Sequence, residues 1–95
     1  MWNLKNKTIV ISGATNGIGK AAAIELSKEN PQLLFTYRNQ DLANELLAKI
    51  QNLSPDTLVH SVYCDFSSQD SIKKCTDKIN DLCRGIDVLI NNAGV

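Results

Sequence analysis

The stretch Ser12-Gly13-Ala14-Thr15-Asn16-Gly17-Ile18-Gly19 decides the fold, because its glycines have G-x-x-x-G-x-G spacing. It follows the β-branched run at residues 8–11, which predicts a buried strand, and it opens a segment rich in helix formers. Gly13 permits a tight turn off the strand, and Gly17 lets a ligand approach bare backbone. Gly19 lets the helix pack close to the sheet.

This glycine loop is expected to bind an anion. The N–H groups at the start of the following helix point at a ligand, and the helix dipole favours negative charge there. Thr15 and Asn16 add side-chain donors, so a pyrophosphate is the natural occupant. A glycine-rich turn without a ligand is the alternative. The position of the glycines between a β-branched strand and an amphipathic helix favours the ligand site.

Strands and helices alternate along the whole chain. Apolar runs predict strands at residues 8–11, 33–37, 58–63 and 87–90, with helical periodicity between them. Such alternation implies a parallel sheet with right-handed crossovers. We therefore expect an α/β fold, namely part of a Rossmann-type, three-layer arrangement with about four strands in the order 3-2-1-4 and three helices.

Each expected helix has an apolar stripe that should face the sheet. The stripe of the first helix consists of Ile18, Ala22 and Leu26. The second helix begins near residue 40 and has the clearest period, at Leu42, Ala43, Leu46, Leu47, Ile50 and Leu53. The third is capped by Ser67 or Ser68 and ends at Gly85, with a stripe of Ile72, Cys75, Ile79, Leu82 and Cys83.

The crossovers should place the first two helices on one face of the sheet and the third on the other. The fourth strand is then an open, poorly covered edge, which is a liability for pairing or aggregation. We therefore expect the isolated chain to be marginally stable and to need a continuation or a partner.

Composition and charge exclude several classes of function. The 95 residues suffice for one domain or less, and ten basic residues balance ten acidic ones. A chain without net charge has no bulk attraction to nucleic acid or to an anionic membrane. The N-terminus lacks signal-peptide features, and the three cysteines show no C-x-x-C spacing. We expect a cytoplasmic protein with core cysteines, a structural His60 and no metal.

The residue after the second strand selects the cofactor. In this kind of site an acid accepts hydrogen bonds from a free ribose 2′-hydroxyl, whereas an arginine pairs with a 2′-phosphate. Arg38 follows Tyr37 about 20 residues after Gly19, close to the usual spacing. Asp41 already belongs to the next helix. We expect a preference for NADP(H), the alternative being a solvated arginine on a loop.

Together these motifs resemble the short-chain dehydrogenase/reductase family over nearly the whole chain. The glycine loop is similar to the family's T-G-x-x-x-G-I-G, with Ser12 in place of threonine. Cys64-Asp65-Phe66 follows the third strand, and Asn91-Asn92-Ala93-Gly94 matches N-N-A-G after the fourth. The segment at residues 37–39 is similar to NADP-preferring members, including the retinol-dehydrogenase-like branch.

The resemblance implies a role for each motif. The loop holds the pyrophosphate and Arg38 the 2′-phosphate, while Asp65 and Phe66 contact adenine. Asn92 and the backbone at Ala93 and Gly94 flank the adenosine ribose. The implied cofactor-binding residues are Gly13, Thr15, Asn16, Gly17, Ile18, Gly19, Arg38, Asp65, Phe66, Asn92, Ala93 and Gly94.

Some of these residues also have plainer interpretations. Asn91 is expected to tie the fourth strand to its neighbours, and Ser12 keeps the hydroxyl of the family's threonine. If the resemblance to the family is set aside, Asp65 is interpreted as a turn-forming aspartate after a strand. Asn91 and Asn92 are then interpreted as ordinary loop amides.

Members of this family transfer hydride between nicotinamide and a carbonyl or alcohol carbon, using a tyrosine and a lysine four residues later. Here Tyr37 is followed at that spacing by Asp41, and Tyr63 by Ser67. We expect residues 1–95 to be the N-terminal dinucleotide-binding half of one Rossmann domain, inactive alone. The complete protein would act on a small carbonyl or alcohol substrate, with a homo-oligomer left open. The alternative is a stand-alone, non-catalytic nucleotide-binding or interaction module.

Overall fold

The computed structural model describes residues 5–14 and 17–91. Strands and helices alternate in it, in this order: β1 (Thr8–Ser12), α1 (Gly17–Ser27), β2 (Gln32–Tyr37), α2 (Gln40–Leu53), β3 (Leu58–Tyr63), α3 (Gln69–Leu82) and β4 (Val88–Asn91). The strands form one parallel sheet in the order β3-β2-β1-β4. The expected Rossmann-type α/β architecture and strand order are therefore confirmed. Within the described ranges, no helix is long and apolar enough to cross a membrane.

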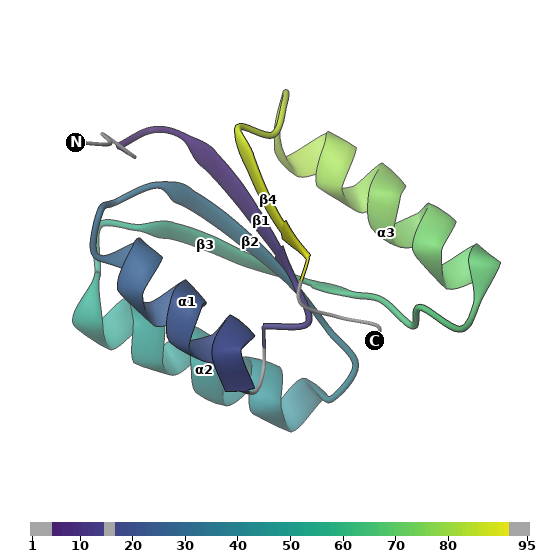
Figure 1. Cartoon of the computed structure of the whole chain (residues 1–95), viewed down its shortest axis with the longest axis horizontal. Coiled ribbons are helices and arrows are strands. Elements are labelled where there is room, and N and C mark those ends of the chain that lie inside the picture. The colour runs from purple at the N-terminus through teal and green to yellow at the C-terminus, as the bar shows by residue number, and fades with distance from the viewer. Residues whose placement is uncertain (1–4, 15–16, 92–95) are drawn as a thin grey trace.

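The helices cover the two faces of the sheet as expected. Figure 1 shows α1 and α2 side by side on one face and α3 on the other. β1 lies between β2 and β4, and all five of its residues are buried. The glycine loop thus leaves the sheet from its most protected strand.

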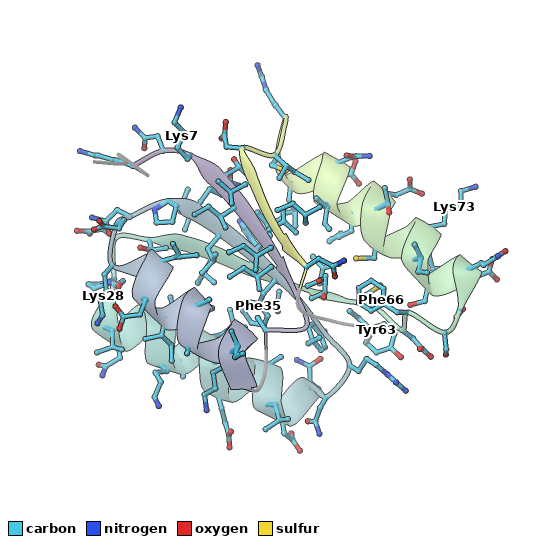
Figure 2. The ribbon with its side chains drawn as sticks, in the orientation of Figure 1. Lys7, Lys28, Phe35, Tyr63, Phe66 and Lys73 are labelled. Carbon is cyan, nitrogen blue, oxygen red and sulfur yellow. The ribbon has the colours of Figure 1, made fainter. Side chains whose placement is uncertain are left out.

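The larger core lies between the sheet and the helix pair. Alternate residues of the central strands point into it, and in Figure 2 Phe35 lies between the sheet and α1. Its fully buried large side chains include Ile9, Ile11, Leu33, Phe35 and, from α2, Leu46 and Ile50. Burying a side chain of this size contributes about 1.5–3 kcal/mol. The second core, under α3, is smaller and contains Val62, Cys64 and Cys75.

The expected stripe of the first helix was only partly right. Leu26 packs against the larger core, but Ile18 is 81% exposed, and the buried residues of α1 are Gly19, Ala23 and Ser27. The expected stripe followed an apolar repeat of four, whereas a helix that packs closely on a sheet places small residues at the contact. The Ser27 hydroxyl donates to the Ile24 carbonyl (2.7 Å), which satisfies this buried polar group.

The other two helices differ from expectation in smaller ways. Leu53 and Ile72 are exposed rather than part of the core, because each lies within the end turns of its helix. The N-cap of α3 is Ser68, whose hydroxyl accepts the Ser71 N–H. This helix ends at Leu82, before the expected Gly85.

The open edge at β4 is present. Leu89 is 64% exposed and the preceding Ile86 is also exposed, while Val88 and Ile90 are only partly buried against the larger core. An apolar strand edge of this kind agrees with the expectation of an incompletely covered sheet. Marginal stability of the isolated chain stays a prediction.

A polar network fastens the amino-terminal end of the sheet. The Thr8 N–H donates to the Asp87 carboxylate (2.8 Å), and the Asp87 N–H donates to the Thr8 carbonyl (2.9 Å). Gln32 accepts from the Thr8 hydroxyl and donates to the Leu82 carbonyl at the end of α3. Asp87 therefore joins the start of β4 to β1 through two reciprocal hydrogen bonds.

Asp87→Ala should lower the free energy of unfolding by about 1–2 kcal/mol, because the site is partly buried and the lost bond is charge-assisted. Urea denaturation measures the change. Asp77→Ala, at an exposed position of α3, is the matched control and should change stability by less than about 0.5 kcal/mol. Equal effects of the two substitutions would contradict the role given to Asp87.

Candidate functional site

The carboxyl ends of the four strands meet at one edge of the sheet, and the expected site residues follow them. In spatial order the edge carries Asp65 after β3, Arg38 after β2, Gly13 after β1 and Asn91 at the end of β4. Ligands of open α/β sheets bind at this edge. The expected contributions of Thr15, Asn16, Asn92, Ala93 and Gly94 lie outside the described residues.

The glycine loop has the backbone that its sequence requires. Gly13 and Gly17 have φ values of 68° and 60°, in the left-handed region that side chains rarely adopt. A Cβ atom built on Gly17 would meet nothing within 4 Å, so the space over this residue is open. α1 begins at Gly17, and the first N–H groups of a helix have no intrahelical partner. The loop therefore presents bare backbone and helix donors to an open space.

Two hydrogen bonds fix the start of the loop from opposite sides. The Ser12 hydroxyl donates to the side-chain oxygen of Asn91 on β4 (2.9 Å). On the other side, the Gly13 N–H donates to the Thr36 hydroxyl of β2 (2.9 Å). The first contact confirms that Asn91 ties β4 to its neighbour. The buried Thr36 was not foreseen, because its role depends on the pairing of β1 with β2.

Arg38 stands at the end of β2 with its charge accessible. Its side chain is 69% exposed, and its Nε lies 3.9 Å from Oδ1 of Asp65, whose side chain is 24% exposed. A long, solvated pair of this kind holds the guanidinium weakly, so the group can turn to another anion. The next residue, Asn39, caps α2 by accepting the Leu42 N–H (3.1 Å). This N-cap was not predicted from the sequence, although an asparagine just before a periodic apolar segment is its usual signal.

Asp65 is held in a turn. Its carboxylate accepts the N–H (3.0 Å) and the hydroxyl (2.7 Å) of Ser67, and its own N–H donates to the Ser71 hydroxyl (2.8 Å). The turn-forming interpretation of Asp65 is thus confirmed, and contact with adenine stays a prediction beside it. The exposed Phe66 follows, and Figure 2 shows it with Tyr63 at this end of the sheet.

Hydrogen bonding keeps Asp65 ionised. The Ser67 hydroxyl, then the Ser67 N–H, and more weakly the Arg38 charge hold the pKa of the Asp65 carboxyl below its ordinary value, against partial desolvation. Because the pKa is lowered in the folded state, the stabilisation is present above the unfolded pKa. It is lost as the pH falls through the folded value.

Ser67→Ala should raise the pKa of Asp65, because it removes the strongest of these interactions. Carboxyl carbon NMR across the acid range measures the titration midpoint. Ser71→Ala is the matched control, because the Ser71 hydroxyl bonds the Asp65 backbone rather than its carboxylate. An unchanged titration midpoint of Asp65 in Ser67→Ala would contradict the assignment of the lowered pKa to the Ser67 hydroxyl.

Cys75 offers no nucleophile. Burial, together with the hydrogen bond and the charge of the adjacent Cys64 thiol, raises the pKa of the Cys75 thiol to about 12. The Cys75 thiol therefore stays protonated at neutral pH, and Cys64 and Cys75 pack as small core residues. Their proximity was not foreseen from the sequence. In the part of the chain that the structure describes, no cluster of histidine, cysteine or carboxylate side chains could hold a metal ion.

Comparison with known proteins decides the family. Residues 7–95 match the short chain dehydrogenase family. The chain belongs to this family. The resemblance inferred from the glycine loop and the N-N-A-G segment is therefore confirmed.

Curated relatives include oxidoreductases of bacterial origin. The chain is 38% identical over 95 residues to the uncharacterized oxidoreductase YxbG of Bacillus subtilis (strain 168), covering 100% of this chain and 34% of YxbG. It is 33% identical over 92 residues to the 3-oxoacyl-[acyl-carrier-protein] reductase FabG of Aquifex aeolicus (strain VF5), covering 97% and 37%. The chain therefore spans about a third of the length of these relatives.

Solved structures give the same result. YwfH, an NADPH dependent reductase involved in bacilysin biosynthesis, matches with a TM-score of 0.87 and 32% identity, over 95% of this chain and 38% of YwfH. L-sorbose reductase from Gluconobacter frateurii, solved with NADPH and L-sorbose, matches with a TM-score of 0.88 and 26% identity, over 98% and 35%.

Proposed function

We propose that this chain is the NADP(H)-binding portion of a short-chain oxidoreductase that transfers hydride between nicotinamide and a carbonyl or alcohol substrate. The observation that carries the proposal is the glycine loop, which leaves β1 with two left-handed glycines and an open space over Gly17. Similar structures named as NADPH dependent or solved with NADPH support it.

Each group of residues at the carboxyl-terminal edge of the sheet binds a different part of the cofactor. The Gly13 N–H is already donated to Thr36, so Gly13 makes the turn. The pyrophosphate is then bound by the first N–H groups of α1, with Gly17 leaving room for its approach. Asp65 and Phe66 contact adenine, and Asn92, Ala93 and Gly94 complete the ribose side. When bound, the cofactor supplies or accepts the hydride.

Arg38 gives the preference for the phosphorylated cofactor. The only acid close to its guanidinium in the described part of the chain is Asp65, which already accepts two hydrogen bonds from Ser67. An arginine binds phosphate through several charge-assisted hydrogen bonds, so it gains more from a 2′-phosphate than from a 2′-hydroxyl. Asp41, which could accept from a hydroxyl, lies within the first turn of α2.

The catalytic step needs residues that this sequence does not contain. A tyrosine works as an acid or base near neutral pH only when a cation stabilises its phenolate. Tyr37 instead donates its hydroxyl to the Gln40 side chain (3.0 Å), and neither tyrosine is followed by lysine at the family's spacing. We propose that the chain alone binds cofactor without turning over substrate, and that the substrate is a small carbonyl or alcohol compound.

Arg38→Ala should weaken NADPH binding about tenfold or more and leave NADH binding nearly unchanged, because only NADPH carries the 2′-phosphate. Calorimetric titration of both cofactors measures the two affinities. Arg84→Ala, at the opposite end of the sheet, removes the same charge and is the matched control. An equal loss for both cofactors would remove the selective role of Arg38.

Gly19→Val should abolish the binding of both cofactors by pushing α1 away from the sheet, since Gly19 is buried. Gly85→Val is the control, because a Cβ atom there meets nothing within 4 Å. Circular dichroism verifies that both variants fold. Unchanged cofactor affinity in a folded Gly19→Val protein would refute the role of the loop.

A further inference from the structure

Thr36 is the one polar residue among the four buried residues of β2. The strand reads Gln-Leu-Leu-Phe-Thr-Tyr, and its buried positions are Leu33, Leu34, Phe35 and Thr36. A valine would have the same shape as Thr36 and would bury more apolar surface. A buried hydroxyl is costly unless it is hydrogen-bonded, so the partner of the Thr36 hydroxyl decides whether a threonine is favourable here.

That partner is the backbone of the glycine loop. The Thr36 hydroxyl accepts the Gly13 N–H (2.9 Å), and Thr36 is only 3% exposed. Gly13 is the first residue after β1, and its φ of 68° lies in the left-handed region. The hydrogen bond therefore joins β2 to the residue at which the neighbouring chain turns away from the sheet.

The glycine loop needs such a bond, because its own sequence leaves it many conformations. Gly13 and Gly17 both have positive φ, and glycine adopts positive and negative φ with similar ease. A loop with two such residues can leave β1 in several directions. Contacts with the flanking strands select one direction, through Ser12 and Asn91 on one side and through Gly13 and Thr36 on the other.

We infer that Thr36 is a positioning residue for cofactor binding, which holds the turn of the glycine loop in the free protein. The inference rests on the proposed function. Because Thr36 is buried, it acts through the Gly13 N–H rather than by touching the cofactor. The apparent affinity for a ligand falls with the fraction of protein that has the binding-competent conformation. The Thr36 hydroxyl raises that fraction and so strengthens cofactor binding.

This role differs from that of Arg38, although the two residues are close in sequence. Arg38 follows Thr36 by two residues, and its exposed guanidinium can reach the 2′-phosphate that distinguishes NADPH from NADH. The turn that Thr36 holds leads to the N–H groups for the pyrophosphate, which both cofactors contain. Loss of the Thr36 hydroxyl should therefore weaken NADPH and NADH by the same factor, whereas loss of Arg38 should separate them.

Hydrogen exchange without cofactor tests the link between Thr36 and the loop. The Gly13 amide should exchange about tenfold faster in Thr36→Val, which removes its acceptor, and within about twofold of the unchanged chain in Thr36→Ser, which keeps a hydroxyl. Thr57→Val is the matched control, because the buried Thr57 hydroxyl donates to the Ser27 carbonyl (2.6 Å) at the amino-terminal end of the sheet. It should leave the exchange of Gly13 unchanged.

Calorimetric titration of the same variants of the whole chain measures cofactor binding, after circular dichroism has verified that they fold. Thr36→Val, and Thr36→Ala as a second variant without the hydroxyl, should weaken NADPH and NADH about tenfold each. Thr36→Ser and Thr57→Val should change both affinities less than about twofold.

Three results would overturn the inference and leave the proposed function intact. They are unchanged Gly13 exchange in Thr36→Val, unchanged cofactor affinity in folded variants without the Thr36 hydroxyl, and an equal loss of affinity in Thr57→Val. If the unchanged chain bound neither cofactor, the proposed function would fail, and the positioning role would fail with it.

Discussion

The structure depends on how the carboxyl end of β1 is held. Ser12 is bonded to Asn91 on one side, and Gly13 is bonded to Thr36 on the other, at the point where the chain turns from strand to helix. A left-handed glycine turn is entropically costly, and bonds to two flanking strands offset that cost. The same contacts aim the start of α1 along the sheet edge. The geometry of this edge of the sheet therefore depends on the pairing of both β2 and β4 with β1.

Alternation predicted the parallel sheet, and the glycine loop selected the doubly wound template that has the order 3-2-1-4. Each predicted strand agrees with the structure to within a residue or so, since short β-branched runs between helical segments leave little freedom. The face of α1 could not be read in the same way. Ile18 looked like core and is exposed, while Gly19, Ala23 and Ser27 are buried. An apolar repeat marks a stripe of nonpolar residues, but the close contact of α1 with the sheet is made by small residues, one of them the polar Ser27.

For the candidate site, the positions of the residues could be predicted from the sequence, but their contacts could not. Motif spacing predicted that Gly13, Arg38 and Asp65 lie at one edge of the sheet, and they do, because the carboxyl ends of parallel strands coincide. Their hydrogen-bond partners could not be predicted. Thr36 reaches Gly13 from another strand, and Ser71 reaches Asp65 from the following helix. Such contacts depend on register and on helix rotation, neither of which leaves a local signal.

The two open edges of the sheet differ in chemistry. Beside β4, Leu89 and Ile86 present apolar surface, which is stable only when more apolar surface packs on it. Beside β3, the neighbouring surface carries two lysines and two aspartates, Lys74, Lys78, Asp65 and Asp70. Charged side chains remain hydrated at low cost, so this edge can stay open to water. A covering contact would therefore stabilise the apolar edge at β4 more than the polar edge at β3.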